Sequence, residues 1–243
     1  MSIRIEPWMG RTELLLGKDK LHKLINSNVL VVGLGGVGGI AAEMIARSGV
    51  GRMTIVDADT VEETNRNRQI PALISTEGLL KADVLAARLM DINRDLKLKV
   101  IPEFFRDQLT HDVLDQNQFD YALDCIDTLS PKVYFIKACI ERKIPIVSCM
   151  GAGSKVDPTL VQVADISETY NCHLARYTRK YLHRLGIYKG VKAVFSSEKK
   201  EENANVILME ARNKKSAVGT ISYMPTVFGC TMASVAIRDL YSR

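Results

Sequence analysis

A glycine-rich stretch, GLGGVGG at 33–39, stands between a short β-branched run at 28–32 and a segment with helical spacing at 37–47. A strand that ends at such a loop and leads into a helix is typical of a Rossmann-like fold. Glycine permits the tight turn, and the start of the helix attracts phosphate. We expect four glycines of this loop to contact a bound nucleotide: Gly33, Gly35, Gly36 and Gly38. The loop alone fits NAD as well as ATP.

The rest of the first half continues the alternation of strands and helices. It predicts strands at 52–56, 97–102, 121–125 and 144–149, and helices at 11–26, 81–93, 110–116 and 130–142. Elements of this length that alternate along the chain form a mainly parallel sheet with helices on both faces. The expected fold class is therefore α/β, a doubly wound Rossmann-like sheet.

The pattern changes after the Gly-Ala-Gly sequence at 151–153. The second half predicts strands at 160–164 and 206–210, a basic helix at 175–185, a polar loop at 196–205 and a closing helix at 226–241. We interpret the chain as a single domain in two parts. Residues 1–153 form the nucleotide-binding part, and residues 154–243 form a smaller C-terminal extension.

The composition excludes several classes of protein. With 243 residues, of which 47% are apolar, the chain can bury the core of one large α/β domain. No stretch approaches the roughly 20 apolar residues needed to span a bilayer, and no leader is evident, so we expect a cytoplasmic protein without a transmembrane segment. The five cysteines contain no Cys-x-x-Cys pair, which argues against a disulfide framework and against zinc.

Acidic and basic side chains follow the second predicted strand. Asp57 ends this strand, where a dinucleotide fold places the acid that binds ribose, and Asp59 follows it. Asn65, Arg68 and Lys81 come next, and a triphosphate requires such amide and cationic donors, whereas NAD does not. This cluster favours ATP, although ordinary surface charge is the alternative for Arg68 and Lys81.

Two aspartates, Asp124 and Asp127, stand at the end of a later strand. Strand ends at this edge line the ligand crevice, and a carboxylate there can hold Mg²⁺ against phosphates. The alternative is that Asp127 only caps the next helix. We expect Ser130 to be that N-cap, with Pro131 in the first turn, which leaves Asp127 for the metal.

Basic residues gather in the second half of the chain, although the net charge is only +5. Arg176, Arg179 and Lys180 are three and four positions apart and therefore share one face of the predicted helix. Such a block indicates a polyanionic partner. A solvated helix face is the alternative.

Four stretches together resemble the E1-like family, which includes the ThiF, MoeB and HesA proteins and the ubiquitin-activating enzymes. They are GLGGVGG (33–39), VDADTVEETNRNRQ (56–69), EGLLKA (77–82) and DCIDTLSPK (124–132). The resemblance covers nearly the whole chain and implies an enzyme that uses ATP to adenylate a carboxylate.

By this resemblance, the glycine loop, Asp57, Asn65, Arg68 and Lys81 bind ATP, and Asp127 is the aspartate associated with Mg²⁺. Arg11 looks like the N-terminal arginine of this family, which reaches the nucleotide of the other protomer. That role would require a homodimer, and an arginine on a helix surface is the alternative.

The second half resembles one branch of the family, the tRNA threonylcarbamoyladenosine dehydratases, at 151–167, 173–187 and 193–198. This implies activation of the carboxylate of N6-threonylcarbamoyladenosine at position 37 of tRNA, followed by cyclisation with loss of water. An acceptor within the substrate needs neither a catalytic cysteine nor a carrier protein. Arg176, Arg179 and Lys180 are then the expected tRNA contacts, and residues 154–243 serve tRNA binding and dimerisation. A sulfur-transfer protein is left open as a further partner.

Three other functions are alternatives. The first is an adenylyltransferase that activates the C-terminus of a ubiquitin-like or sulfur-carrier protein, although the paired zinc cysteines usual in such enzymes are missing. Cys172, beside His173 and near Arg176, is the candidate reactive thiol for that reading, but we favour a structural role. An NAD-dependent oxidoreductase and a non-catalytic RNA-binding module are weaker alternatives.

Overall fold

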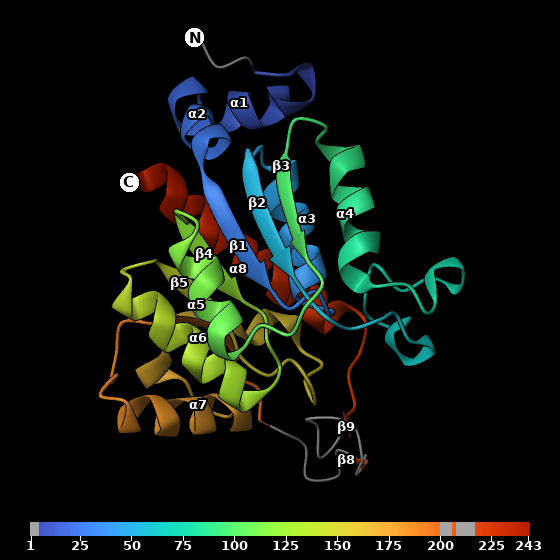
Figure 1. Cartoon of the computed structure of the whole chain (residues 1–243). Helices are drawn as coiled ribbons and strands as arrows, with labels where there is room; N and C mark the ends of the chain where they lie inside the picture. Colours follow the sequence, from blue (N-terminus) through green and yellow to red (C-terminus); the bar gives the residue numbers. More distant parts are fainter. Residues whose placement is uncertain (1–4, 200–205, 208–216) are drawn as a thin grey trace.

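The computed structural model describes residues 5–199, 206–207 and 217–243. Its centre is a seven-stranded sheet in the order β3-β2-β1-β4-β5-β7-β6 (Figure 1). The strands are β1 (Asn28–Val32), β2 (Arg52–Val56), β3 (Lys97–Ile101), β4 (Tyr121–Asp124), β5 (Ile146–Cys149), β6 (Val161–Asp165) and β7 (Lys192–Ser196). All neighbouring pairs are parallel except β6 and β7, which are antiparallel at one edge. The predicted doubly wound, mainly parallel sheet is confirmed.

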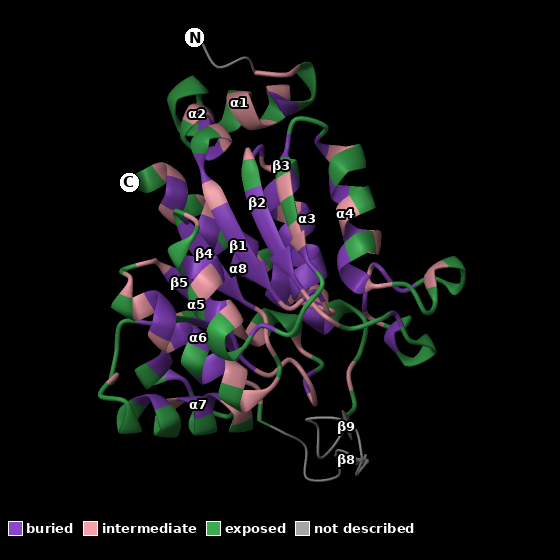
Figure 2. Cartoon of the chain, viewed as in Figure 1, coloured by how far each residue is buried: buried purple, intermediate pink, exposed green. Residues whose placement is uncertain are grey.

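Helices cover both faces of this sheet, and alternate residues of β1 face the two layers. Val29 and Val31 pack with α3 (Gly38–Arg47), α4 (Lys81–Ile92) and α8 (Tyr223–Ser242). Leu30 and Val32 pack on the other side with α5 (Asp107–Asp115), α6 (Leu129–Glu141) and α7 (His173–Arg184). Figure 2 shows the buried strands between these layers. Within the described residues, no helix is both long and apolar enough to cross a membrane.

The remaining helical elements are short. Short 3-10 helices occur at Pro7–Met9, Glu63–Asn65, Ile74–Thr76, Pro158–Leu160 and Ile166–Glu168. The single helix predicted at 11–26 is instead two helices, α1 (Gly10–Leu16) and α2 (Lys18–Asn26). Gly17 separates them with φ +80°, a conformation that residues with a Cβ rarely adopt. The prediction of one continuous helix was wrong because it passed over this glycine.

The second half joins the same sheet as the first. The sequence patterns missed β7, which pairs with β5 and carries β6 at the sheet edge. The closing helix α8 begins at Tyr223, three residues before its predicted start. Only part of the strand predicted at 206–210 can be compared: β8 (Val206–Ile207) pairs with β9 (Ala217–Val218), and 208–210 lie outside the described residues.

Candidate functional site

The glycine loop turns sharply at the carboxyl end of β1. Gly33 has φ +87°, and a Cβ added to Gly38 would lie 1.7 Å from the carbonyl oxygen of Gly33. A Cβ added to Gly36 would lie 2.9 Å from the Cβ of Pro225 in α8. The glycines therefore let the loop fold closely on itself and on the start of α8. The loop ends at the start of α3, where free backbone N–H groups favour an anion.

Asp57 ties the end of β2 to this loop. Its Oδ2 accepts a hydrogen bond from the backbone N–H of Leu34 at 2.6 Å, and its Oδ1 accepts one from the N–H of Asp59 at 2.8 Å. Burial raises the pKa of the Asp57 carboxyl, while the two N–H groups act to lower it. The carboxyl group lies beside the loop, where folds of this type bind a ribose.

Lys81 and Asp59 form an ion pair at the same edge of the sheet. Lys81 begins α4 and is buried, and its Nζ lies 3.0 Å from Oδ2 of Asp59, which is exposed. Two predicted nucleotide-binding residues are thus brought together, but the lysine charge already has a carboxylate partner. A phosphate that binds this lysine must displace Asp59 or share Nζ with it.

The segment with Asn65 and Arg68 packs against the glycine loop. A Cβ on Gly36 would lie 3.1 Å from the carbonyl oxygen of Arg68. Asn65 is buried, and its Oδ1 accepts a hydrogen bond from the N–H of Glu62 at 3.3 Å. The Arg68 guanidinium donates to the carbonyl of Thr64 at 2.9 Å. The Arg68 backbone thus lies at the loop, and the side chains of both residues are bonded within their own segment, so their contact with a nucleotide stays a prediction.

Gln69 also lies at the loop, although the sequence patterns gave it no role. Its side chain is buried, and the amide nitrogen would lie 3.7 Å from a Cβ on Gly35. The amide oxygen has no hydrogen-bond partner within the part of the chain that the structure describes. Buried polar atoms without a partner are rare in proteins, so this amide suits a contact formed when the loop holds a ligand. The sequence feature that could have indicated Gln69 is its position directly after Arg68.

A buried ion pair supports the neighbouring loop at the end of β4. Asp124 and Lys132 are fully buried, and Lys132 Nζ lies 2.5 Å from Oδ2 of Asp124 and 2.9 Å from the carbonyl oxygen of Cys149. Ser148 donates to the same Oδ2, and Oδ1 accepts from the N–H of Ile126 at 3.1 Å. Burial raises the pKa of Asp124, and Lys132 opposes that effect. Lys132 ends the DCIDTLSPK motif at 124–132, but no sequence pattern indicated that it would pair with Asp124.

Asp127 is exposed at the start of α6, on the loop that Asp124 holds. A Cβ on Gly33 would lie 2.8 Å from the carbonyl oxygen of Cys125, so this loop touches the glycine loop. The expected cap is wrong: α6 begins at Leu129, its N-cap is Thr128, and Ser130 lies inside the first turn. Thr128, and not Asp127, is that N-cap, so Ser130 gives no reason to assign Asp127 to a metal.

The donor set at this edge suits Mg²⁺ only together with a nucleotide. Among the described residues, no group of three or more His, Cys, Asp or Glu side chains could hold a metal ion. Mg²⁺ commonly binds through one or two carboxylates, phosphate oxygens and several waters. An exposed carboxylate such as Asp127 next to the glycine loop fits that pattern, whereas a metal site made only of protein side chains does not.

Arg11 lies far from the glycine loop within one chain. It is exposed on α1, which together with α2 stands at the end of the sheet where β1 begins (Figure 1). Arg11 lines a hollow with Ile237, Arg238 and Tyr241 in the last turns of α8. The first turn of α8, at Pro225, touches the glycine loop, and about 13 residues of helix separate the two regions by roughly 20 Å. The folded chain does not bring Arg11 to its own loop.

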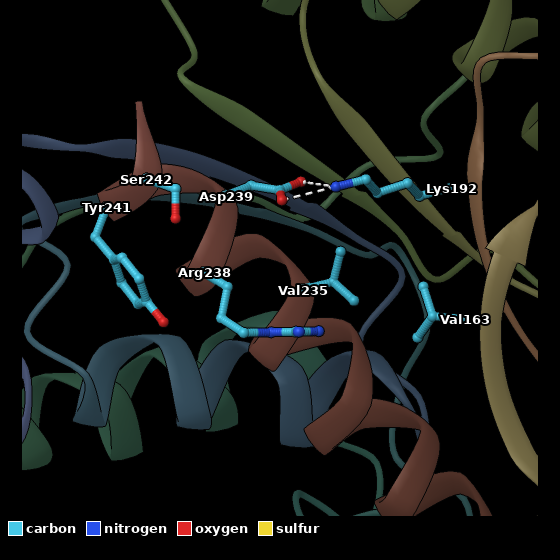
Figure 3. A pocket seen from close by; sticks show the side chains of 7 residues that line it. All are labelled: Val163, Lys192, Val235, Arg238, Asp239, Tyr241 and Ser242. Atoms are coloured by element: carbon cyan, nitrogen blue, oxygen red, sulfur yellow. Dashed lines mark hydrogen bonds and ion pairs between the residues drawn. The ribbon is translucent and has the colours of Figure 1, made fainter.

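A second hollow adjoins the first. Its volume is about 530 Å³, and it is lined by Val163, Lys192, Val235, Arg238, Asp239, Tyr241 and Ser242 (Figure 3). Lys192 Nζ lies 2.6 Å from Oδ2 of Asp239, which also accepts a hydrogen bond from the hydroxyl of Tyr121 at 2.7 Å. None of the residues predicted for the nucleotide lines this hollow.

The basic residues of α7 do not all face solvent. Arg176 and Lys180 are exposed, but the Arg179 guanidinium donates to the carbonyl of Thr169 at 2.7 Å and also to its hydroxyl. The helix start is fixed by Cys172, whose Sγ accepts from the N–H of Gly151 at 3.4 Å and from a helix N–H. Arg179 therefore supports the structure through Thr169, and its contact with tRNA stays a prediction.

The sheet order, the glycine loop and the acidic and basic residues at the carboxyl edge together define a Rossmann-like α/β protein of the E1-like class. The chain belongs to the ThiF family, whose model matches residues 10–242. The family resemblance inferred from the four sequence stretches is confirmed.

Relatives of similar length share most of this chain. It is 40% identical over 238 residues to the tRNA threonylcarbamoyladenosine dehydratase of Bacillus subtilis (strain 168), with 95% of this chain and 93% of the relative covered. The Escherichia coli (strain K12) protein of that name is 35% identical, with 96% and 93% covered. Crystal structures of the E. coli enzyme in complex with ATP and with AMP superpose with TM-scores of 0.88 and 0.89, each at 32% identity over 99% of this chain and 98% of the other.

Proposed function

We propose that this protein is an ATP-dependent tRNA threonylcarbamoyladenosine dehydratase. In this reaction, the carboxylate of N6-threonylcarbamoyladenosine in tRNA is adenylated and the modification then cyclises with loss of water. The observation that carries the proposal is the match to enzymes of this name over almost their full length. The site supports it, because the glycine loop, Lys81 and Asp127 lie at one edge of the sheet.

We assign the nucleotide to this edge. The glycine loop and the start of α3 would bind phosphate through backbone N–H groups, and Asp57 would accept hydrogen bonds from the ribose. Arg68 and Lys81 would neutralise phosphate oxygens once their present partners, Thr64 and Asp59, give way. Asn65 would keep the segment with Arg68 in place, since its side chain closes the turn before it.

Asp127 would hold Mg²⁺ together with phosphate oxygens. The metal supplies stabilisation of the charge that develops as pyrophosphate leaves. The Asp124–Lys132 pair has the supporting task of fixing the loop that carries Asp127, through the N–H of Ile126. The fixed loop keeps the carboxylate next to the glycine loop before any ligand arrives.

The chemistry needs no protein nucleophile. A carboxylate oxygen of the substrate attacks the α-phosphorus of ATP, and the bond to pyrophosphate breaks. The neighbouring ureido group, which loses a proton, then attacks the activated carbonyl carbon, and AMP leaves with the former carboxylate oxygen. Because both reacting groups belong to one modification, the second step benefits from a high effective concentration.

The remaining assignments concern partners and place. We infer that Arg176 and Lys180 contact the tRNA backbone and that residues 154–243 form the part that binds tRNA and mediates dimerisation. Arg11 would act on the nucleotide of the other protomer in a homodimer. A cytoplasmic location belongs to the same proposal, and a sulfur-transfer partner is left open.

The test is incubation of the protein with ATP, Mg²⁺ and tRNA that contains N6-threonylcarbamoyladenosine, followed by mass spectrometry of the nucleosides. The expected product is one water lighter than the substrate and forms only with ATP. Parallel incubations replace the tRNA with a Gly-Gly-tailed carrier protein, or replace ATP with NAD. Formation of a carrier adenylate without any change in the tRNA would contradict the proposal and favour the carrier-activating alternative.

A further inference from the structure

Helix α7 exposes tyrosines and cations side by side on its outer surface. We define the α7 face as Arg176, Tyr177, Lys180, Tyr181 and Arg184, all of which are exposed. The opposite side of the helix is fully buried at Ala175, Thr178 and Leu182, where it packs in the core layer that contains α6. Tyr177 and Tyr181 remain accessible to a partner, with exposed fractions of 45% and 41%.

Helix geometry arranges this face in two rows. Arg176, Lys180 and Arg184 recur every fourth residue and form a basic row, and Tyr177 and Tyr181 form an aromatic row next to it. The guanidinium carbon of Arg184 lies 5.0 Å from the centre of the Tyr181 ring. The sequence of α7, HLARYTRKYLHR, contains no acidic residue. The face is therefore positive and presents flat aromatic surfaces.

We propose that the α7 face binds an unpaired segment of RNA, with Tyr177 and Tyr181 stacked on bases and the basic row on the phosphates. This inference rests on the proposed function and names the form of RNA that the enzyme holds. Surfaces that grip single-stranded nucleic acid combine these two chemistries, because any base can stack on an aromatic ring and every nucleotide carries a phosphate. A paired duplex hides its bases and cannot use the tyrosines.

The position of α7 agrees with this task. Cys172, at the start of the helix, accepts a hydrogen bond from Gly151, which follows β5 at the carboxyl edge of the sheet. The glycine loop after β1 lies at that same edge, and Figure 1 shows α7 at the end of the molecule away from α1 and α2. The helix is about 18 Å long, enough for about five stacked nucleotides. An RNA loop along α7 can therefore extend toward the adenylation site.

The composition of the face favours RNA over a membrane surface. Helices that lie on bilayers insert aliphatic and aromatic side chains together. The α7 face has tyrosines but no leucine, isoleucine or valine, and its cations stand next to the rings. A phosphate backbone with unpaired bases satisfies both rows at once.

The test compares a hairpin that has an unpaired loop with a fully paired RNA of equal length. The probe is an anticodon stem-loop of tRNA, and its affinity is measured by fluorescence anisotropy across a salt series. Tyr177→Leu/Tyr181→Leu should weaken hairpin binding about tenfold or more, since stacking contributes about 1–3 kcal/mol per base. The matched control, Tyr177→Phe/Tyr181→Phe, keeps both rings and should bind like the wild type.

The salt series separates the two rows. Arg176→Ala/Lys180→Ala should flatten the logarithmic salt dependence by up to about 0.7 for each lost phosphate contact with a single strand. The double leucine variant should lower affinity without changing that slope, because it removes no charge. Its thermal melt and its stabilisation by ATP should match the wild type, since the two rings lie outside the core.

Three results would overturn the inference. The first is a double leucine variant that binds the hairpin as tightly as the wild type while it still dehydrates full tRNA, a result that would leave the proposed function intact. The second is an equal loss of affinity for the hairpin and the paired RNA. The third is loss of binding to anionic lipid vesicles with hairpin affinity unchanged. A wild-type protein that binds no RNA and modifies no tRNA would contradict the proposed function as well.

Discussion

At the scale of single residues, burial separates two aspartates that stand three positions apart. Asp124 is fully buried and bonded to Lys132, whereas Asp127 is exposed beside the glycine loop. A buried and paired carboxylate is suited to holding a loop in place. An exposed carboxylate is suited to binding a metal ion that is also coordinated by water and phosphate oxygens. The sequence pattern pointed to both residues, but only their surroundings distinguish the two roles.

Asp127→Asn should therefore lower turnover strongly while the protein stays folded. Loss of the charge that holds Mg²⁺ removes several kcal/mol of transition-state stabilisation, so we expect kcat to fall by about a hundredfold or more. The measurement is AMP release with tRNA and ATP, combined with a thermal melt. Asp91→Asn, an equally exposed change in the last turn of α4, is the matched control. Near-normal kcat in the Asp127 variant would rule out the metal role.

Removing one partner of the Asp124–Lys132 pair should strongly lower the free energy of unfolding. Lys132→Met leaves a buried carboxylate without its cation, and we expect a loss of about 3–5 kcal/mol in the free energy of unfolding. Ser148→Ala removes only one hydrogen bond to the same carboxylate and should cost about 1 kcal/mol. Chemical denaturation of both variants measures the difference.

The double variant Asp124→Leu/Lys132→Met tests whether this pair positions the loop that carries Asp127 or only stabilises the fold. Removing both charges should recover most of the lost stability. Turnover should stay low, because nothing then fixes the N–H of Ile126 and the loop with Asp127. A stable double variant with full turnover would show that the pair has no positioning role.

Cys172 should be dispensable for catalysis. Its Sγ accepts hydrogen bonds from the backbone N–H groups of Gly151 and Ala175 at the start of α7, and the second of these bonds caps the helix. Cys172→Ala should lower stability by about 1 kcal/mol and keep most of the turnover, and Cys172→Ser should retain the cap. Loss of activity in a folded Ala variant, or a trapped thioester, would instead favour the carrier-activating alternative.

At the scale of elements, the sequence predicted the strand-loop-helix unit around the glycine loop because every signal there is local. The β-branched residues of β1, the glycines and the apolar spacing of α3 all lie within one short stretch. β7 was missed for the opposite reason: it is a short strand after Gly190 that is buried because β5 and β6 lie on either side of it. Its partners are distant in the sequence, so no local pattern reports them.

The same limit applies to the site. The sequence placed Asp57, Lys81 and Asp127 at one edge because the ends of parallel strands meet there. It could not show that Lys81 is paired with Asp59 or that Arg179 is held by Thr169, since those contacts depend on side-chain directions. That the side-chain amide oxygen of Gln69 has no hydrogen-bond partner among the described residues can be seen only in the folded chain.

Gly17 offers a test of how α1 is held relative to α2. Its φ of +80° disfavours any residue with a Cβ, yet an added Cβ would touch nothing within 4 Å. Gly17→Ala should therefore destabilise the protein by backbone strain alone, by about 1–3 kcal/mol. Gly10→Ala is the matched control, because Gly10 has helical φ of −55° and equal space, and it should be neutral or slightly stabilising. Equal melting temperatures for the two variants would contradict this account.

At the scale of the whole molecule, two features lie at the end of the sheet opposite the glycine loop. Helix α1 exposes Leu14 and Leu15 at 89% and 82%, and Arg11 lines the hollow beside the last turns of α8. Single exposed leucines are ordinary on a protein surface, but these two are adjacent, and a contiguous apolar patch is a feature of surfaces where two proteins meet. The separation of Arg11 from its own glycine loop fits an arginine that serves another protomer.

Mixed dimers test that arrangement directly. Arg11→Ala and Asp127→Asn homodimers should each be nearly inactive, because every site in them lacks one of the two side chains. A dimer with one copy of each variant contains one site with both defects and one site that is intact. If subunits exchange freely at equal amounts, half of the dimers are mixed, and activity should rise to about a quarter of the wild-type value.

Dehydration of tRNA is measured before and after the two proteins are mixed. Activity that stays at the level of the separate variants, although differently tagged subunits co-purify, would mean that Arg11 does not act across the dimer.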